Sequence, residues 1–170
     1  MTPEEFQQHL KTLSVRFKDT FSRYAPTAIG KIAVSLFKQN FQTEGFFGER
    51  WKEVKRRQDG KNFKTITRGE RKGETRAVNA WGRRKILTGA TGDLGRSIEY
   101  KVEGNGTVMI FTNPSIFGKE PYARVHNEGL HAGRGGGFTM TKRQFIGDHP
   151  ALRAEIINEL NRKLIEITNK

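Results

Sequence analysis

The sequence predicts an α+β protein in which helices at both ends flank a central region of extended chain. Three observations lead to this prediction. Apolar residues recur at helical spacing before residue 45 and after residue 150, and they alternate at strand spacing between residues 98 and 112. Residues 52–85 follow neither period and are rich in lysine and arginine. Elements of one kind are therefore grouped along the chain, which favours the α+β class.

The first apolar pattern predicts two N-terminal helices. One face of the first helix carries apolar residues at steps of four, three, four and four, namely Phe6, Leu10, Leu13, Phe17 and Phe21. Thr2 suits the N-cap of this helix, and Pro3 suits its first position. We expect Pro26 to separate this helix from a second one, which ends near Gly45.

The segment from Lys52 to Lys85 carries most of the positive charge of the chain. Its thirteen cations and four acids contribute +9 to a formal net charge of +13. The cations are Lys52, Lys55, Arg56, Arg57, Lys61, Lys64, Arg68, Arg71, Lys72, Arg76, Arg83, Arg84 and Lys85. Because apolar residues are sparse here, we expect a long mobile arm, with an extended hairpin as one form it takes. Such an arm favours a polyanionic partner, and the alternative is a solvated loop that only aids solubility.

A β-hairpin and a last helix are predicted after the arm. Alternating runs at Ile98–Val102 and Val108–Thr112 are joined through Gly-Asn-Gly, a strong hairpin signal. A shorter strand is expected near residues 137–140, within a Gly-rich loop at residues 129–140. The last helix is expected to take Asp148 as its cap, to begin near Pro150 and to pack on the small sheet.

The sequence contains no pattern of a metal or cofactor site. There is no cysteine, which excludes disulfides and thiolate zinc sites. His126 and His131 are five residues apart, whereas a helical zinc motif needs a spacing of four, and Gly129 interrupts any helix between them. The glycine run that follows has no phosphate-loop ending. We therefore expect no cofactor and no metal.

Catalytic patterns are also missing from the sequence. No serine stands in a Gly-x-Ser-x-Gly turn. A magnesium-dependent nuclease would need clustered acids, but Asp59, Asp93 and Asp148 lie in separate segments. We therefore expect a protein that is not an enzyme. No apolar run reaches the roughly 20 residues of a membrane helix, and the polar, acidic N-terminus does not resemble a signal peptide.

Four patches together carry a family resemblance. They are Phe41–Val54, Lys85–Ile98, Tyr122–Gly129 and Arg143–Gly147. In order and spacing they resemble the phage virion morphogenesis proteins, the tail-completion group typified by the G protein of phage Mu. The residues that carry the likeness are Phe41, Trp51, Leu87, Thr88, Gly89, Leu94, Ser97, Ile98, Tyr122, Ala123, His126, Gly129, Arg143, Phe145 and Gly147. The sequence departs from the family at Gln144, where proline is usual, and at Ile146, where leucine is usual.

The resemblance implies a structural role late in virion assembly. It implies one domain over residues 1–170 that acts in tail completion or head–tail joining, as part of a ring around the DNA path. The implied partners are other copies of the chain, tail-tube, tail-terminator or neck proteins, and packaged double-stranded DNA through phosphate contacts. The implied location is the neck or head-proximal tail end of the virion, with the host cytoplasm before assembly and no membrane.

The motif residues also have structural roles that the residues themselves suggest. Trp51 is expected to hold the start of the arm on the core, and Leu87, Leu94 and Ile98 to fix its return. His126 is expected to be a hydrogen-bonded packing residue rather than a ligand. The alternative to an assembly protein is a nucleic-acid-binding protein that uses the basic arm without sequence preference. In that alternative Trp51, Phe63 and Trp81 would stack on bases.

Overall fold

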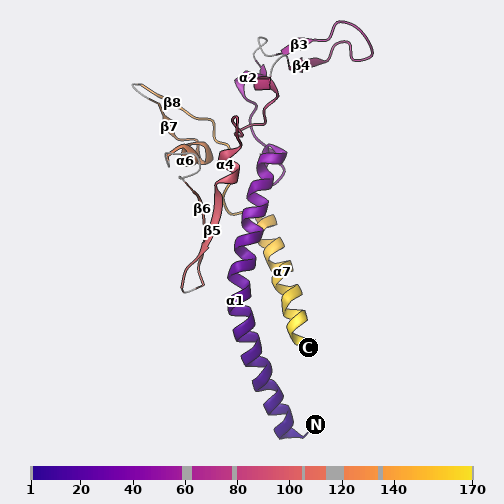
Figure 1. Ribbon diagram of the computed structural model, residues 1–170, viewed down its shortest axis with the longest axis vertical. Helices are drawn as coiled ribbons and strands as arrows, with labels where there is room; N and C mark the ends of the chain where they lie inside the picture. Colours follow the sequence, from indigo (N-terminus) through magenta and orange to yellow (C-terminus); the bar gives the residue numbers. More distant parts are fainter. Residues whose placement is uncertain are drawn as a thin grey trace. The chain divides into compact units, whose positions relative to one another are not determined.

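A computed structural model describes residues 2–58, 63–77, 80–104, 106–113, 121–133 and 136–169. The fold class is α+β, as predicted (Figure 1). The helices are α1 (Pro3–Thr43), α2 (Lys55–Gln58), α3 (Ala80–Arg83), α4 (Asp93–Arg96), α6 (Pro121–Glu128) and α7 (Pro150–Thr168). The strands are β1 (Gly45–Phe46), β2 (Glu49–Arg50), β3 (Phe63–Thr65), β4 (Thr75–Ala77), β5 (Ile98–Val102), β6 (Val108–Thr112), β7 (His131–Ala132) and β8 (Phe138–Thr139).

The described strands form four separate two-stranded ladders. Each strand pairs with its neighbour in the chain, in the order β1–β2, β3–β4, β5–β6 and β7–β8. The β5–β6 pair is the hairpin predicted from alternating residues, and β8 is the short strand expected near residues 137–140. Bonds from the Asn113 N–H to the Ser97 carbonyl and from the Glu103 N–H to the Thr107 carbonyl make the β5–β6 pair antiparallel.

The chain divides into two compact units. Unit 1 comprises Met1–Leu36, Glu99–Phe111 and Asp148–Lys170. Unit 2 comprises Phe37–Ile98 and Thr112–Gly147. The basic segment and all of the family-motif residues therefore belong to unit 2.

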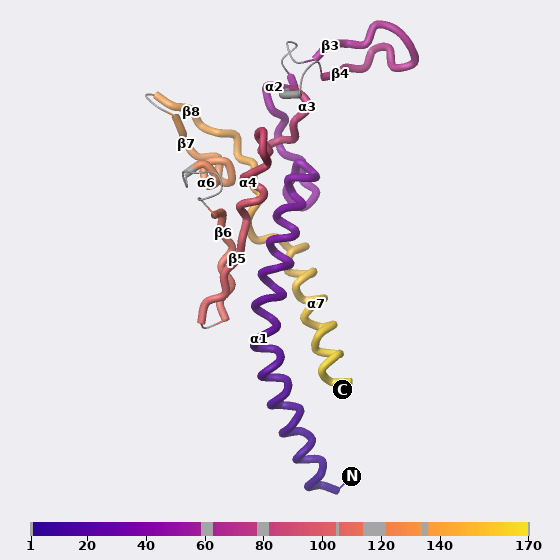
Figure 2. The backbone as a smooth tube through the Cα atoms, viewed as in Figure 1, coloured from indigo at the N-terminus to yellow at the C-terminus, as the bar shows by residue number. Residues whose placement is uncertain are grey.

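The first helix is continuous from Pro3 to Thr43, so the predicted break at Pro26 is wrong (Figure 2). A proline inside a helix removes one backbone hydrogen bond at a cost of about 3 kcal/mol. Packing around the proline compensates for this loss. Ala25 and Ala28, on either side of it, are buried. The helix ends before Glu44, which adopts a left-handed φ of 54°.

The start of α1 is held by a capping box, which confirms Thr2 as the cap. The Glu5 N–H donates to the Thr2 hydroxyl at 3.2 Å, and the Thr2 N–H donates to the Glu5 carboxylate at 2.7 Å. These two bonds satisfy backbone donors that the first turn of a helix leaves without partners.

Unit 1 is built on α1. The Tyr24 hydroxyl donates to Glu159 of α7, and the Lys163 ammonium lies 5.1 Å from the centre of the Tyr24 ring. These contacts hold α7 against α1, whereas the sequence placed it on the hairpin. The prediction of Asp148 as the cap of α7 is wrong, because the cap is His149, whose Nδ1 accepts from the Ala151 N–H at 3.1 Å. Asp148 instead pairs with Arg153.

The close approach of β5 to α1 requires a glycine at position 30. A Cβ built on Gly30 would lie 2.1 Å from Cδ2 of Tyr100. We therefore expect Gly30→Ala to lower the free energy of unfolding by about 2 kcal/mol, since overpacking outweighs the higher helix propensity of alanine. Urea denaturation checks this. In a Tyr100→Ala background the same change should stabilise, and a stabilising effect in the parent chain would contradict the packing.

Unit 2 has a small aromatic core. The Phe41 ring lies 5.5 Å from the Trp51 ring and 5.2 Å from the Phe145 ring, measured between centroids. Ile86, Leu94 and other apolar side chains around them are also buried. This core fixes the two ends of the basic segment and the chain after α6, where the family motifs converge.

Candidate binding arm and its base

The middle of the basic segment is an antiparallel hairpin, as the sequence allowed. Phe63 lies opposite Ala77, Lys64 opposite Arg76, and Thr65 opposite Thr75. Backbone bonds between Ile66, Gly73 and Glu74 continue the ladder into the turn. Figure 1 shows this hairpin extending away from the rest of unit 2. The expected mobility of the arm stays a prediction.

The hairpin carries exposed cations on a short length of chain. Between residues 63 and 77 there are five cations and two acids. The cations Lys64, Arg68, Arg71, Lys72 and Arg76 are all exposed. Arg71 pairs with Glu74 at 2.6 Å, a surface ion pair that leaves both side chains largely in water. The hairpin therefore presents a net positive surface that a polyanion can reach.

Other cations of the segment have a different, structural task. Arg56 donates to the carbonyls of Arg84 and Lys85 at 3.0 and 2.8 Å. Arg57 also donates to the Arg84 carbonyl, and the Lys85 ammonium donates to the Gln42 carbonyl at 2.8 Å. These bonds tie residues 56–57 to residues 84–85, so the two ends of the segment are held together at its base.

Glu44 is the acid at the centre of this base. It accepts two bonds from Arg57, at 2.9 and 2.5 Å, and one from the Ile86 N–H at 2.6 Å. Burial by itself raises the pKa of Glu44, but the bonds from Arg57 and Ile86 outweigh it and hold the pKa below its ordinary value. The same pairing raises the pKa of Arg57. The carboxylate therefore stays charged and joins both ends of the segment.

Glu44→Gln is expected to lower the free energy of unfolding by about 2 kcal/mol, because it weakens charge-assisted bonds in a partly buried place. Since the folded pKa is depressed, this contribution is present above the unfolded pKa of about 4.3 and is lost as the pH falls through the folded value. Urea denaturation at pH 7 measures it. The matched control is Glu53→Gln, which removes a more exposed partner 3.6 Å from Arg57 and should cost less than about 0.5 kcal/mol. Equal costs would contradict a special role for Glu44.

The start of the segment is fixed to the chain after β8. The Trp51 indole donates to the Gln144 carbonyl at 2.7 Å, and the side chain of Trp51 is buried. The Arg143 guanidinium donates to the Lys52 carbonyl at 3.0 and 2.9 Å. Burial, and then the charge of Arg56, lower the pKa of Arg143. Two family-motif residues thus hold the first residues of the arm.

The sequence did not single out two asparagines that complete this arrangement. Asn127 accepts from the N–H groups of Phe145 and Ile146 at 2.9 and 3.0 Å. Asn40 donates to the Phe145 carbonyl at 3.2 Å and accepts from the Phe47 N–H at 3.1 Å. A signal existed for Asn40, because it stands among apolar positions of α1 and a buried amide needs partners.

The Leu-Thr-Gly motif and α4 form the return from the arm. Leu94, Ser97 and Ile98 are buried, and the Ser97 hydroxyl donates to the Leu94 carbonyl at 2.7 Å. Leu87 adopts a left-handed φ of 59°, and the Thr88 hydroxyl donates to the Lys85 carbonyl at 2.7 Å in the turn before Gly89. This segment returns the chain to β5.

His126 is a buried residue of α6. Its side chain is 6% exposed, and within the described part of the chain its Nδ1 has no hydrogen-bond partner. His126 is therefore buried as a packing residue would be, and within the described residues its Nδ1 does not make the hydrogen bond that was expected. Burial, followed by the charge of Arg143, lowers the pKa of His126 to about 4. The Tyr122 ring packs edge-on at 4.5 Å between centroids.

The end of α6 separates the two histidines of the motif. Gly129 has a φ of 75°, and the N–H groups of Gly129 and Leu130 both donate to the Val125 carbonyl, so the helix ends in a left-handed glycine cap. A Cβ on Gly129 would lie 2.8 Å from the Cβ of Lys142. His131 then follows in β7, so His126 and His131 lie on different elements.

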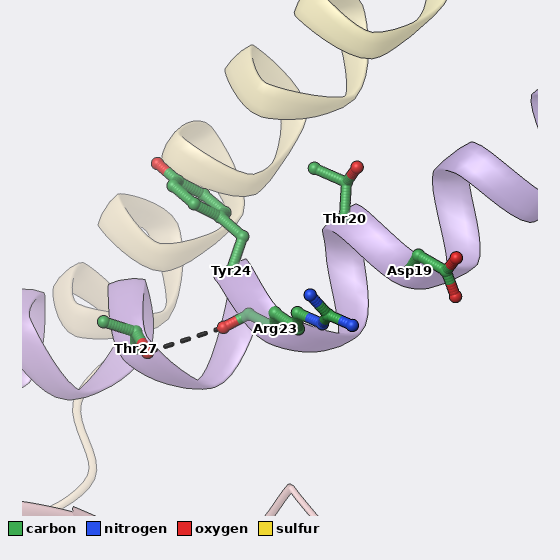
Figure 3. A pocket seen from close by; sticks show the side chains of 5 residues that line it. All are labelled: Asp19, Thr20, Arg23, Tyr24 and Thr27. Atoms are coloured by element: carbon green, nitrogen blue, oxygen red, sulfur yellow. Dashed lines mark hydrogen bonds between the residues drawn. The ribbon is translucent and has the colours of Figure 1, made fainter.

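Two surface depressions differ in how their lining residues are arranged. The larger, of about 460 Å³, is lined by Asp19, Thr20, Arg23, Tyr24 and Thr27 (Figure 3). All five residues belong to α1, and the Thr27 hydroxyl donates to the Arg23 carbonyl at 3.4 Å. Because no second element supplies lining residues, the side chains do not converge on one point as a ligand site requires.

The smaller depression, of about 200 Å³, lies in unit 2 between the Leu-Thr-Gly segment and Tyr122. Its acid is Asp93, which accepts bonds from Thr91 and Arg96, and these bonds lower its pKa. Asp93 is therefore not tuned to act as a proton donor near neutral pH.

The remaining candidate residues of unit 2 differ in exposure. Tyr122 is half exposed, while Ala123 is buried. Gly147 lies where a Cβ would meet the Gln144 side chain. Lys52, Lys55 and Arg83 are exposed, and Lys61 lies outside the described residues.

Metal-binding clusters and membrane spans are both missing from the part of the chain that the structure describes. The described residues contain no group of three His, Asp or Glu side chains that could hold a metal ion. Nor does any described helix have the length and apolarity needed to cross a membrane.

Comparison with known proteins identifies the class of this chain, a phage assembly protein. Residues 47–165, more than half of the chain, match the phage virion morphogenesis family. The chain therefore belongs to the phage virion morphogenesis family. No significant match was found among curated proteins or solved structures. Membership supports a structural role in phage assembly and an association with the virion.

Proposed function

We propose that this chain acts in tail completion or head–tail joining, as one subunit of a ring around the DNA path. The observation that carries the proposal is that the cations of the basic segment fall into two groups, in a chain of a virion assembly family. Arg56, Arg57 and Lys85 make structural bonds at the base, whereas the β3–β4 hairpin presents its cations to solvent. A charged hairpin on a fixed base is suited to contact a polyanion or an acidic protein face.

The mechanism proposed is binding without catalysis. In the ring, the hairpins of neighbouring copies either line the lumen and face DNA phosphates or dock on an acidic face of the adjoining ring. The short β7–β8 hairpin of the Gly-rich loop would order against a neighbouring copy in the same assembly. Other copies of the chain and tail-tube, tail-terminator or neck proteins are the partners in this proposal.

The first test is immunogold labelling of purified particles from the source phage or induced prophage. Label at the head–tail junction is the expected result. Label elsewhere on the particle, or none, would overturn the neck or tail-end role.

The second test examines the hairpin directly. A variant with glutamine at Lys64, Arg68, Lys72 and Arg76 leaves the Arg71–Glu74 pair in place and removes four positive charges. The matched control places glutamine at four exposed lysines elsewhere, Lys31, Lys38, Lys101 and Lys142. In a gene-deficient phage, we expect the control to restore joined particles and the hairpin variant to leave separate heads and tails. Equal rescue by both variants would exclude the hairpin from the joining step.

A second candidate function is sequence-independent nucleic-acid binding by the free chain. The exposed hairpin cations favour it, since each phosphate contact contributes a slope of about −0.9 to the dependence of log affinity on log salt. A steep fall of the affinity for duplex DNA with rising salt would support this function if the hairpin variant, and not the lysine control, reduces the slope. Weak binding with a slope near zero would exclude it, and ring formation that does not depend on salt would favour the assembly role.

A further inference from the structure

The N-terminal part of α1 carries an apolar face that is exposed to solvent. Phe6 is 52% exposed, Leu10 50% and Phe17 37%. Around them, residues 2–12 and 14–19 are all exposed, and Leu13 is half-buried. In Figure 1, α1 continues beyond the C-terminal end of α7 within unit 1. This part of the helix therefore gains little from contacts within its own chain.

Such a helix is expected to need a partner. A water-exposed helix of this length is only marginally stable by itself, because most helix stability in proteins comes from packing of an apolar face. At about 100° per residue, Phe6, Leu10, Leu13 and Phe17 fall within a stripe roughly 60° wide. A stripe this narrow, with steps of four, three and four, is typical of the seam between two paired helices rather than of the broad face of a helix in a globular core.

The spacing of the apolar residues indicates which molecule covers this face. The steps from Phe6 to Phe17 are four, three and four, so the pattern reads the same in both directions. In an antiparallel pair, Phe6 of one copy lies opposite Phe17 of the second copy, and Leu10 lies opposite Leu13. The same patch then serves both copies, which is the requirement of a two-fold symmetric interface.

The charges beside the stripe favour the antiparallel direction. Glu5 and Arg16 flank the stripe on the same side of the helix. In this register, Glu5 of one copy and Arg16 of the other are offset by roughly 3 Å along the shared axis, at 1.5 Å per residue. An antiparallel pair brings Glu5 of each copy next to Arg16 of the other. In a parallel pair these residues of the two copies would lie on opposite sides of the seam, so the Glu5–Arg16 contact would be lost, and the two helix dipoles would align unfavourably.

We propose that two copies of this chain associate through an antiparallel pairing of residues 4–19 of α1. The inference is independent of the proposed function, since this segment lies outside the matched residues 47–165 and outside the basic segment. Few side chains take part, so the interface belongs to the small, weak class below about 1,200 Å² in total. We expect a dissociation constant on the order of 10 μM.

Sedimentation equilibrium of the full chain between about 1 and 200 μM tests the pairing. The parent protein is expected to change from monomer to dimer over this range. Leu10→Glu should weaken the dimer at least about tenfold, because it places a charge in the seam. The matched control is Val15→Glu, which changes a 60% exposed apolar residue on the opposite side of the helix and should leave the dimer unchanged. Circular dichroism verifies that both variants fold.

A double-mutant cycle tests the direction. Arg16→Glu should weaken the dimer, since it faces Glu5 of the second copy, and much less so in a Glu5→Gln background. Glutamine at position 5 keeps the capping box, so the helix start is preserved. A parent chain that stays monomeric at 200 μM, or equal losses in the Leu10 and Val15 variants, would overturn the proposal. Equal effects of Arg16→Glu in both backgrounds would overturn the antiparallel register.

Discussion

Replacing Phe145 by alanine is expected to lower the free energy of unfolding by about 4 kcal/mol, because it opens a cavity in the aromatic core of unit 2. The side chain is 1% exposed, and its ring packs on Phe41 at 5.2 Å between centroids. Asn127 and Asn40 bind the backbone on either side of it, so the surrounding chain cannot easily move to fill the cavity. Both the transfer cost and the cavity cost therefore apply in full.

Urea denaturation followed by circular dichroism measures this loss. Phe138→Ala is the matched control, because Phe138 is 61% exposed, and it should cost less than about 0.5 kcal/mol. If Phe145→Ala fails to fold, Phe145→Leu supplies the measurement, with an expected loss of about 1 kcal/mol. A loss at Phe145 no larger than at Phe138 would show that this ring is not part of the core of unit 2.

Local signals predicted much of the fold. The alternating residues around Gly104 predicted the β5–β6 hairpin, and Thr2 followed by Pro3 predicted the first cap, to which the structure adds the contacts of Glu5. The break at Pro26 was mistaken because the cost of an interior proline is local, whereas the burial of Ala25 and Ala28 that offsets it depends on distant residues. The prediction of Asp148 as the cap of α7 was wrong for a simpler reason. His149 and Asp148 both have side chains that can accept a bond, and their order in the chain does not decide between them.

The base of the arm could not be predicted in the same way. The sequence showed thirteen similar cations and gave no means to separate those that bind backbone carbonyls from those that face solvent. Arg56 reaches carbonyls 28 and 29 residues away, and Arg143 reaches one 91 residues away. Such contacts exist only after the core has brought these segments together, so the separation of base from hairpin is information that only the structure supplies.

Lowering the pH from 8 to 5 is expected to reduce the free energy of unfolding by about 2 kcal/mol through His126 alone. Burial, then the charge of Arg143, lower the pKa of this histidine to about 4, against an ordinary value of about 6.5 in the unfolded chain. Between pH 6.5 and pH 4, His126 is protonated in the unfolded chain but stays neutral in the folded chain. The contribution of this group is therefore fully present above pH 6.5 and is lost as the pH falls toward 4.

His126→Phe separates this effect from the titration of the acids. Phenylalanine keeps a ring against Tyr122 and removes a buried nitrogen that has no partner among the described residues, so at pH 8 the stability should change by less than about 1 kcal/mol. At pH 5 the variant should exceed the parent chain by about 2 kcal/mol, since all other groups titrate alike in both proteins. Urea denaturation of the pair at the two pH values gives this difference. The same pH dependence in both proteins would mean that His126 takes up its proton in the folded state, which requires a partner for Nδ1 and a more hydrated α6 than its burial indicates.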